Sequence, residues 1–296
     1  MRNFISFHYD GPITREHQVS ARTLGSTLVH LQSAIDRAVI DLRHDGVHKH
    51  ARLKREDYLF ADFELSRPRD GGFILDLVNA GPLKIVDRIN AAIKSAYGVA
   101  TRDALPVLAR SLNQQAEHLQ TLHEIDAIEP SSLRELHTQY GSTSANRRYA
   151  DRSINKEINQ VLTQLRVERY SGSTLDLTLA GTDAYPIYRF NSATAEKFNK
   201  VVSTRMLGDP VLISITIRAM DGGTRNGKKT GKAALVGSNR DFILHFRSAE
   251  DFNRVAPYMR AGDDRPAITI VASPVIEYGT FDTEAGDMFF IDLVRA

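Results

Sequence analysis

The fold class of this chain rests on two stretches near its C-terminus, YRFNSATAEKFNKVVSTRMLGDPVLISITI at residues 188–217 and LHFRSAEDFNRVAPYMRAGDDRPAITIV at residues 244–271. Five features recur in both stretches in the same order, at an offset of about 54–56 residues. The matched features are Phe190 with Phe246, Ser192-Ala193 with Ser248-Ala249, Phe198-Asn199 with Phe252-Asn253, Val201 with Val255, and Gly208-Asp209 with Gly262-Asp263. A shared order of this kind predicts an internal duplication.

Each copy is predicted to be a β-α-β-β unit, at about residues 185–237 and 240–294. In each copy a serine can accept the first N–H groups of a helix, a phenylalanine faces the core, and a glycine follows the helix. These residues are Ser192, Phe198 and Gly208 in the first copy and Ser248, Phe252 and Gly262 in the second. Two such copies are expected to form a pseudo-twofold sheet or a closed barrel, and closure would remove exposed strand edges.

The preceding chain reads as a separate α+β region. Residues 3–9 alternate in the manner of a strand, and an amphipathic helix is predicted over about 17–42. Residues 57–66 and 72–79 are predicted to pair as a hairpin around the turn 67–71. This gives a second β-α-β-β order at the N-terminus.

Helical patterns dominate the middle of the chain. Helices are expected at about 83–97, at 103–127, and from Ser132, which could form a capping box with Glu135. A further helix is expected at about 147–168. The predicted organisation is therefore an N-terminal α+β domain at 1–145 with a helical appendage, a basic connecting helix at 146–170, and the duplicated β-α-β-β domain at 171–296.

Composition excludes several classes of protein. The chain has 296 residues, 42% of them hydrophobic, which suits two domains with ample cores. It has no cysteine, so disulfides and thiolate metal sites are excluded. No apolar stretch approaches the length of a membrane span, and the N-terminal apolar run is too short for a signal peptide. A cytoplasmic protein without a membrane partner is expected.

The hairpin loops of the two predicted copies differ in charge. The first, residues 221–232, is rich in glycine and carries Arg225, Lys228, Lys229 and Lys232. The second, residues 279–287, carries only acidic charges. A glycine-rich basic loop can approach a phosphate backbone closely, so the first loop is a candidate binding site for nucleic acid or an acidic protein.

A second basic feature lies on the connecting helix. Residues 146–170 hold six basic and three acidic residues. Arg148, Arg152 and Lys156 recur at a spacing of four and therefore share one helix face. They are candidate helpers of the basic loop, and a solvated face of a connecting helix is the simpler interpretation.

No catalytic or metal-binding motif is complete. The loop Gly222–Lys229 resembles a P-loop, but Lys229 stands where a hydroxyl is needed and a strand follows. His44, His48 and His50 cluster beside Asp45, and His8 and Asp10 share a strand face. The first group could hold a metal and the second could act in acid–base chemistry, but a polar loop and a hydrogen-bonded turn are the simpler interpretations. No metal and no cofactor is expected.

Three functional hypotheses follow. The leading one is a non-catalytic binding and assembly component of a bacterial multiprotein system, which contacts nucleic acid or an acidic partner through the basic loop. A second is a homo-oligomer in which basic and acidic hairpins pair between subunits. A third is an enzyme that uses His8 and Asp10 or the cluster from His44 to His50. The scarcity of aromatic residues beside the basic ones in the sequence gives no support to stacking of single-stranded bases.

Overall fold

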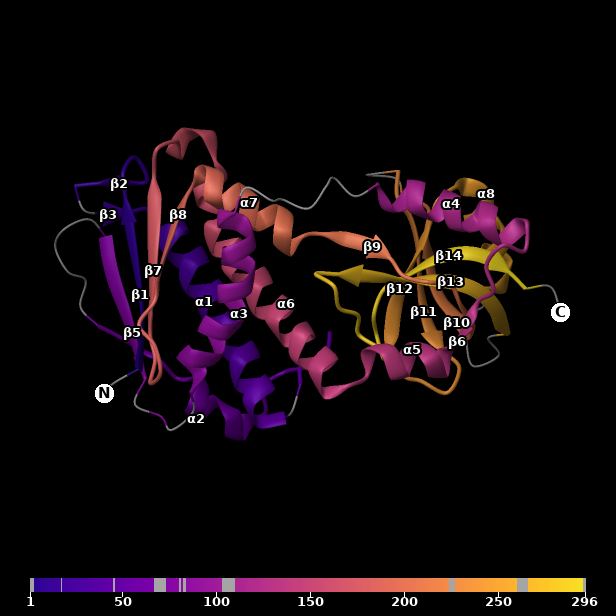
Figure 1. The fold of residues 1–296 in the computed structure, drawn as a ribbon, viewed down its shortest axis with the longest axis horizontal. Helices are drawn as coiled ribbons and strands as arrows, with labels where there is room; N and C mark the ends of the chain where they lie inside the picture. Colours follow the sequence, from indigo (N-terminus) through magenta and orange to yellow (C-terminus); the bar gives the residue numbers. More distant parts are fainter. Residues whose placement is uncertain are drawn as a thin grey trace. The chain divides into compact units, whose positions relative to one another are not determined.

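The computed structural model describes residues 3–16, 18–44, 46–66, 73–79, 81, 84–102, 110–223, 227–259 and 266–294. Helices and strands are mixed along the chain, which folds into two compact units (Figure 1). The first unit comprises residues 1–47, 51–107 and 147–204, and the second comprises residues 48–50, 108–146 and 205–296. Each unit is therefore assembled from three separate stretches of the chain.

An antiparallel sheet of five strands forms the first unit, in the order β4-β5-β1-β7-β8. Its central strand β1 (Asn3–Asp10) pairs with β5 (Phe73–Asn79) on one side and β7 (Thr174–Ala180) on the other. Strands β4 (Glu64–Leu65) and β8 (Ile187–Asn191) form the two edges. The alternation predicted at residues 3–9 is confirmed, because Ile5, Phe7 and Tyr9 are buried.

The helices of the first unit pack on one face of this sheet (Figure 1). They include α1 (Ala21–His44), α3 (Ile85–Thr101), α6 (Thr143–Val161), which also extends into the second unit, and α7 (Ser192–Val202). Their apolar stripes are buried, as the helical periodicity predicted. Among the described helices, none combines the length and hydropathy of a membrane span. The smaller elements of this unit are the pair β2 (Thr14–Arg15) and β3 (Gln18–Val19), α2 (Tyr58–Ala61), and the 3-10 helices Arg55–Asp57, Leu162–Arg166 and Glu168–Tyr170.

A buried ionic network joins three helices of this unit. The guanidinium of Arg88 on α3 lies 2.5 Å from Asp41 on α1 and 2.7 Å from Asp151 on α6. Arg147 reaches Asp41 from the surface, at 3.2 Å. The side chains of Arg88 and Asp41 are only 4% and 2% exposed, so each charge depends on the other for compensation.

The predicted strand at residues 57–66 is wrong over its first half. Residues 55–61 are helical, and only β4 pairs with β5. The carboxylate of Asp57 is fully buried and binds Arg43 at 2.6 Å and His44 at 2.9 Å, and it also accepts the N–H of Lys54. These contacts hold the segment in a helical turn, against the strand propensity of its aromatic residues.

The second unit is built around a closed barrel of five strands. Its strands are β10 (Val211–Asp221), β11 (Lys229–Leu235), β12 (Asp241–Phe246), β13 (Ala267–Glu277) and β14 (Met288–Leu293). They pair in the order β10-β11-β12-β14-β13, and β13 pairs again with β10 to close the barrel. Only β12 and β14 are parallel to each other. The helix α8 (Ala249–Val255) connects the third strand to the fourth.

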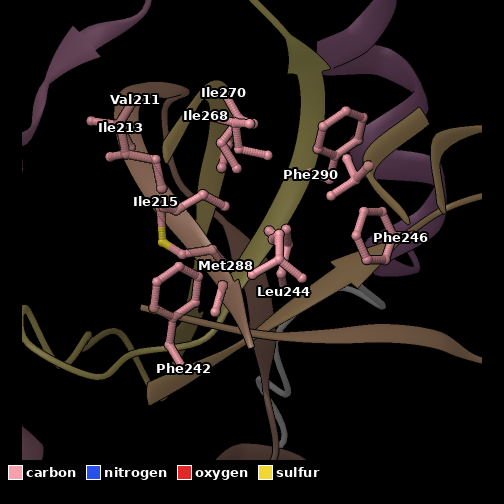
Figure 2. Close-up of a cluster of buried hydrophobic side chains, with 14 of the residues drawn as sticks. Val211, Ile213, Ile215, Phe242, Leu244, Phe246, Ile268, Ile270, Met288 and Phe290 are labelled. Carbon is pink, nitrogen blue, oxygen red and sulfur yellow. The ribbon is translucent and has the colours of Figure 1, made fainter. Parts of the chain in front are cut away.

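Alternate residues of β10, β12, β13 and β14 fill its interior (Figure 2), and β11 adds Ala233. The outer side of β13 and β14 is also covered, because Val271, Phe289 and Ile291 pack with Ala116 on α4 (Leu112–Glu124). The helix α5 (Leu133–Tyr140) adds Leu136 to the barrel core. Its N-terminus has the predicted capping box, in which Ser132 accepts the N–H of Glu135 and Glu135 accepts the N–H of Ser132. Two short strands extend the sheet, β6 (Ser131–Ser132) beside β10 and β9 (Arg205–Leu207) beside β13.

The division of the chain differs from the predicted boundaries at 145 and 171. Residues 171–204 lie in the first unit because β7 pairs with β1 along seven positions and β8 pairs with β7. The predicted duplication is not visible in the structure, since β8 and α7 of the first copy lie in one unit and β12 and α8 of the second copy lie in the other. The barrel is present, and it consists of β10 and β11 from the first predicted copy and β12, β13 and β14 from the second.

Candidate nucleic-acid interface

The basic loop connects β10 to β11, the first two strands of the barrel. The carboxylate of Asp221 accepts the N–H of Gly223 at 2.9 Å, and the N–H of Gly227 donates to the Gly223 carbonyl at 2.9 Å. Gly223 has a φ of +75°, and a Cβ added there would lie 2.2 Å from the carbonyl oxygen of Lys228. Glycine is therefore required where the loop folds back on itself. The predicted site residue Arg225 lies outside the described residues.

Three predicted cations of this loop have different surroundings. Lys228 is exposed. Lys229 begins β11, where its ammonium donates to the Gly222 carbonyl at 3.3 Å and lies 5.8 Å from the centre of the Phe252 ring. Within the described part of the chain, neither ammonium forms an ion pair with a carboxylate. Lys232, in contrast, binds Asp241 at 2.7 Å.

The carboxylate of Asp241 is shared between two strands. Arg218 on β10 lies 2.5 Å from it, on the side opposite the Lys232 contact with its other oxygen. The single negative charge of Asp241 is thus shared by the positive charges of Arg218 and Lys232 on the outer surface of the barrel. Among the described residues, Lys228 and Lys229 therefore carry positive charge without a carboxylate partner, whereas Lys232 is paired.

A row of side chains continues along the outer side of β11 and β12. Lys232 is directly opposite Ile243, and Thr230 is opposite His245. The ring of His245 stacks on Phe289 with 6.2 Å between centroids. Ile243 and His245 are partly exposed, so this face presents both apolar and polar groups to solvent.

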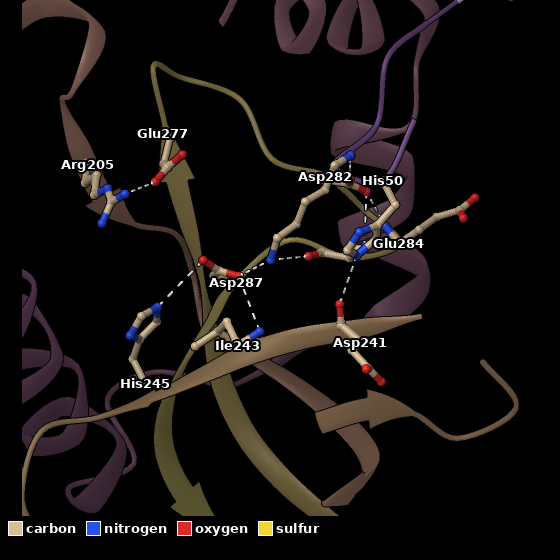
Figure 3. Close-up of polar contacts among 11 residues, drawn as sticks. His50, Arg205, Asp241, Ile243, His245, Glu277, Asp282, Glu284 and Asp287 are labelled. Atoms are coloured by element: carbon tan, nitrogen blue, oxygen red, sulfur yellow. Dashed lines mark hydrogen bonds and ion pairs between the residues drawn. The ribbon is translucent and has the colours of Figure 1, made fainter. Parts of the chain in front are cut away.

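The acidic loop between β13 and β14 is occupied by contacts within the same unit (Figure 3). One oxygen of Asp282 accepts the N–H groups of Glu284 at 2.9 Å and Ala285 at 3.1 Å. Its other oxygen accepts the N–H of Lys49 at 2.6 Å. Glu284 forms an ion pair with Arg240. These acidic side chains are therefore engaged without a second subunit.

Asp287 holds the end of this loop against β12 (Figure 3). Its carboxylate lies 2.6 Å from the ammonium of Lys49 and 3.8 Å from Nε2 of His245, and it accepts the N–H of Ile243 at 3.3 Å. Burial acts to raise the pKa of Asp287, but the contacts with His245 and Lys49 outweigh burial and hold the pKa below its ordinary value of 3.8. Asp287 is therefore ionised across the physiological range.

The predicted basic helix face belongs to the first unit. Arg148 and Lys156 are exposed on α6, and the guanidinium of Arg152 lies 5.1 Å from the centre of the Tyr149 ring. These residues lie in the stretch 147–204, whereas the basic loop belongs to the second unit. The two sets therefore belong to different units.

The histidine cluster of the sequence does not gather at one point. His44 ends α1 and binds Asp57 at 2.9 Å, whereas His50 lies in the second unit with Nε2 3.4 Å from the carbonyl oxygen of Asp241. His48 is also in the second unit, and Asp45 lies outside the described residues. Across the described ranges, no group of three or more His, Cys, Asp or Glu side chains is arranged to hold a metal ion.

The pair of His8 and Asp10 lies at the end of β1. One oxygen of Asp10 accepts the N–H of Gly11 at 2.7 Å, which is the hydrogen-bonded turn that the simpler interpretation predicts. His8 is opposite Ile74 on β5 and Asp176 on β7. The described surroundings of these residues give no separate argument for acid–base chemistry.

Sequence reasoning missed three residues near the basic loop and the β12 face. Lys49 and Arg218 carry no local signal, because their partners Asp287 and Asp241 are brought to them by the fold. Phe252 was expected in the core by analogy with Phe198, which is fully buried. Phe252 does pack against the barrel core, but it is only partly buried and Lys229 lies over its ring, so an aromatic ring lies next to the basic loop.

Comparison with protein families, curated proteins and solved structures gives no match to the chain. The barrel surface carries a glycine-rich loop whose Lys228 and Lys229 have no carboxylate partner among the described residues, and an acidic loop between β13 and β14 whose carboxylates form contacts within the unit.

Proposed function

We propose that the second unit is a non-catalytic nucleic-acid-binding module that contacts phosphates through the loop between β10 and β11. One observation carries this proposal: the uncompensated lysines lie on the connection between the first and second strands of a closed five-stranded barrel. The chain order of the barrel strands is first, second, third, fifth and fourth, with the third and fifth parallel and a helix after the third. This connectivity resembles the OB-fold, in which the face of strands two and three and the 1–2 and 4–5 loops bind oligonucleotides or oligosaccharides.

A shared fold does not establish a function, so the choice of ligand depends on the chemistry of the loop. Lys228 and Lys229 present positive charge that no described carboxylate compensates, which favours a polyanion over a neutral oligosaccharide. Arg225 and Lys232 would add to this charge, and the glycines let the backbone approach the ligand. Phosphate contacts of this kind position a nucleic acid without reading its sequence.

Arg148, Arg152 and Lys156 are proposed as a second basic surface, on the first unit, that assists binding. The two units together would act as a component of a larger bacterial assembly, for which an acidic protein is the alternative partner of the loop. Self-assembly through pairing of the basic and acidic hairpins is less favoured. The carboxylates of Asp282, Glu284 and Asp287, which that pairing would use, are already engaged within the unit.

The test measures binding of a labelled oligonucleotide by fluorescence anisotropy at salt concentrations between about 50 and 300 mM. The salt concentration is varied because each phosphate contact adds about 0.7–0.9 to the slope of log K against log salt. The Lys228→Ala/Lys229→Ala variant should lower that slope by roughly 1.4–1.8. The matched control is Lys94→Ala/Lys200→Ala, which removes two exposed lysines of the first unit. Equal slopes for the two variants would remove the loop from the proposal, and no binding by the native chain at low salt would reject nucleic acid altogether.

A further inference from the structure

Phe252 lies at the foot of the basic loop and is incompletely buried. It belongs to α8, whose first turn is capped by Ser248 through the N–H of Asp251 at 3.0 Å. The ring meets Phe246 edge to face, with 5.5 Å between centroids and an interplanar angle of 81°. Phe252 packs against the barrel core but remains partly exposed, and the ammonium of Lys229 lies over its ring.

The ammonium of Lys229 is held above this ring by weak contacts. Its two described partners are both neutral, the Phe252 ring at 5.8 Å and the Gly222 carbonyl at 3.3 Å. A cation over a partly exposed aromatic ring gains little compared with a cation on a phosphate. An arriving phosphate can therefore draw the ammonium away and leave the ring face open.

The core cluster against which Phe252 packs is bordered by other partly buried apolar side chains. Met220 on β10 and Tyr258, in the 3-10 helix Ala256–Tyr258, are partly buried against the same core cluster as Phe252. Lys229 at the start of β11 pairs with Phe246 at the end of β12, so the loop and α8 lie at the same end of the barrel. An aromatic surface flanked by cations is the arrangement that stacks a base while it binds the adjacent phosphate.

We infer that Phe252 is a stacking platform for an unpaired base and that the ligand of the barrel is single-stranded nucleic acid. This inference rests on the proposed function, because it concerns the same loop. The bases of a duplex already stack on each other and cannot offer a free face to a side chain, whereas every base of a single strand can. Duplex would then bind only through its phosphates, with lower affinity at equal salt.

The absence of tryptophan from the chain allows a direct test. Phe252→Trp makes position 252 the only tryptophan of the protein, and a stacked base should quench its emission when a single-stranded oligonucleotide is added. The control is Tyr185→Trp, an exposed position in the first unit, whose emission should not change. Phe252→Leu keeps an apolar side chain against Phe246 but removes the aromatic face. It should weaken single-strand binding by about fivefold or more, since stacking contributes about 1–3 kcal/mol per base.

The outcomes separate this inference from the proposed function. Quenching at position 252 only, with reduced single-strand affinity of Phe252→Leu and unchanged duplex affinity, supports the platform. If the native chain binds and Lys228→Ala/Lys229→Ala weakens it, but Phe252→Leu binds as the native chain does, the platform is wrong and the phosphate site stands. Binding of duplex as tightly as single strand would also overturn the inference. Thermal unfolding of Phe252→Leu within a few degrees of the native protein shows that lost affinity is not lost folding.

Discussion

Removal of Arg88 should lower the free energy of unfolding of the first unit far more than removal of a surface charge around it. The Arg88→Ala variant leaves the carboxylates of Asp41 and Asp151 without their buried cation. Breaking a buried pair from one side costs about 3–5 kcal/mol, because the remaining charge stays desolvated. Arg147→Ala is the matched control, since Arg147 contacts the same Asp41 carboxylate at 3.2 Å but is 51% exposed. A surface contact of this kind contributes about 1 kcal/mol or less.

Hydrogen–deuterium exchange at increasing urea concentration can follow each unit separately, with peptides from α1 and α3 for the first and from β13 for the second. With a denaturant slope of about 2 kcal/mol per molar urea, the loss predicted for Arg88→Ala moves the midpoint of the first unit down by about 1.5–2.5 M. The midpoint for Arg147→Ala should fall by about 0.5 M or less. Combining Arg88→Met with Asp41→Leu should recover most of the stability, because an apolar pair of similar volume avoids the desolvation cost. Equal shifts for Arg88→Ala and Arg147→Ala would refute this reasoning.

Two further predictions concern the barrel. Gly223→Ala should lower the proposed oligonucleotide affinity and deprotect the loop amides in hydrogen exchange, because the position has a φ of +75° and a Cβ would collide with the Lys228 carbonyl. Gly227→Ala is the control, since its φ of +66° is also left-handed but nothing lies within 4 Å of an added Cβ, so only strain of about 1 kcal/mol is expected. The lowered pKa of Asp287 stabilises the folded barrel above the ordinary value of 3.8, and this stability is lost as the pH falls below that value. The urea midpoint of the second unit should therefore drop less between pH 7 and pH 3 in Asp287→Asn than in the native chain, and an equal drop would contradict the assignment.

Local pattern was sufficient for most individual elements. The alternation of Ile5, Phe7 and Tyr9 and the capping box of Ser132 and Glu135 each depend on residues close together in sequence, and each is confirmed. The strand predicted from Asp57 failed because its helical turn is fixed by Arg43 and His44, which lie more than ten residues away. The periodicity of the segment indicates its strand propensity, but it does not reveal the distant residues that bind the buried carboxylate of Asp57.

The assignment of segments to units was the part that pattern could not supply. The apolar alternation of β7 is compatible with any sheet, and nothing local indicates that its leucines pair beside Phe7. The site divides in the same way. The charge of Lys228 and Lys229 is visible in the sequence, whereas the contact between Lys229 and Phe252 and the ion pair of Lys232 with Asp241 require the closed barrel.

The position of β1 at the centre of its sheet has a consequence during synthesis of the protein. This strand leaves the ribosome before either of its partner strands, and β5 can pair with it once residue 79 has emerged. Its other partner, β7, begins at residue 174. At a synthesis rate of about 5–20 residues per second, one side of β1 stays open for roughly 10 to 30 s. During that interval β1 has one unpaired edge, and its apolar side chains are not yet covered. Newly made copies in the same polysome are therefore the most direct alternative partners for this edge.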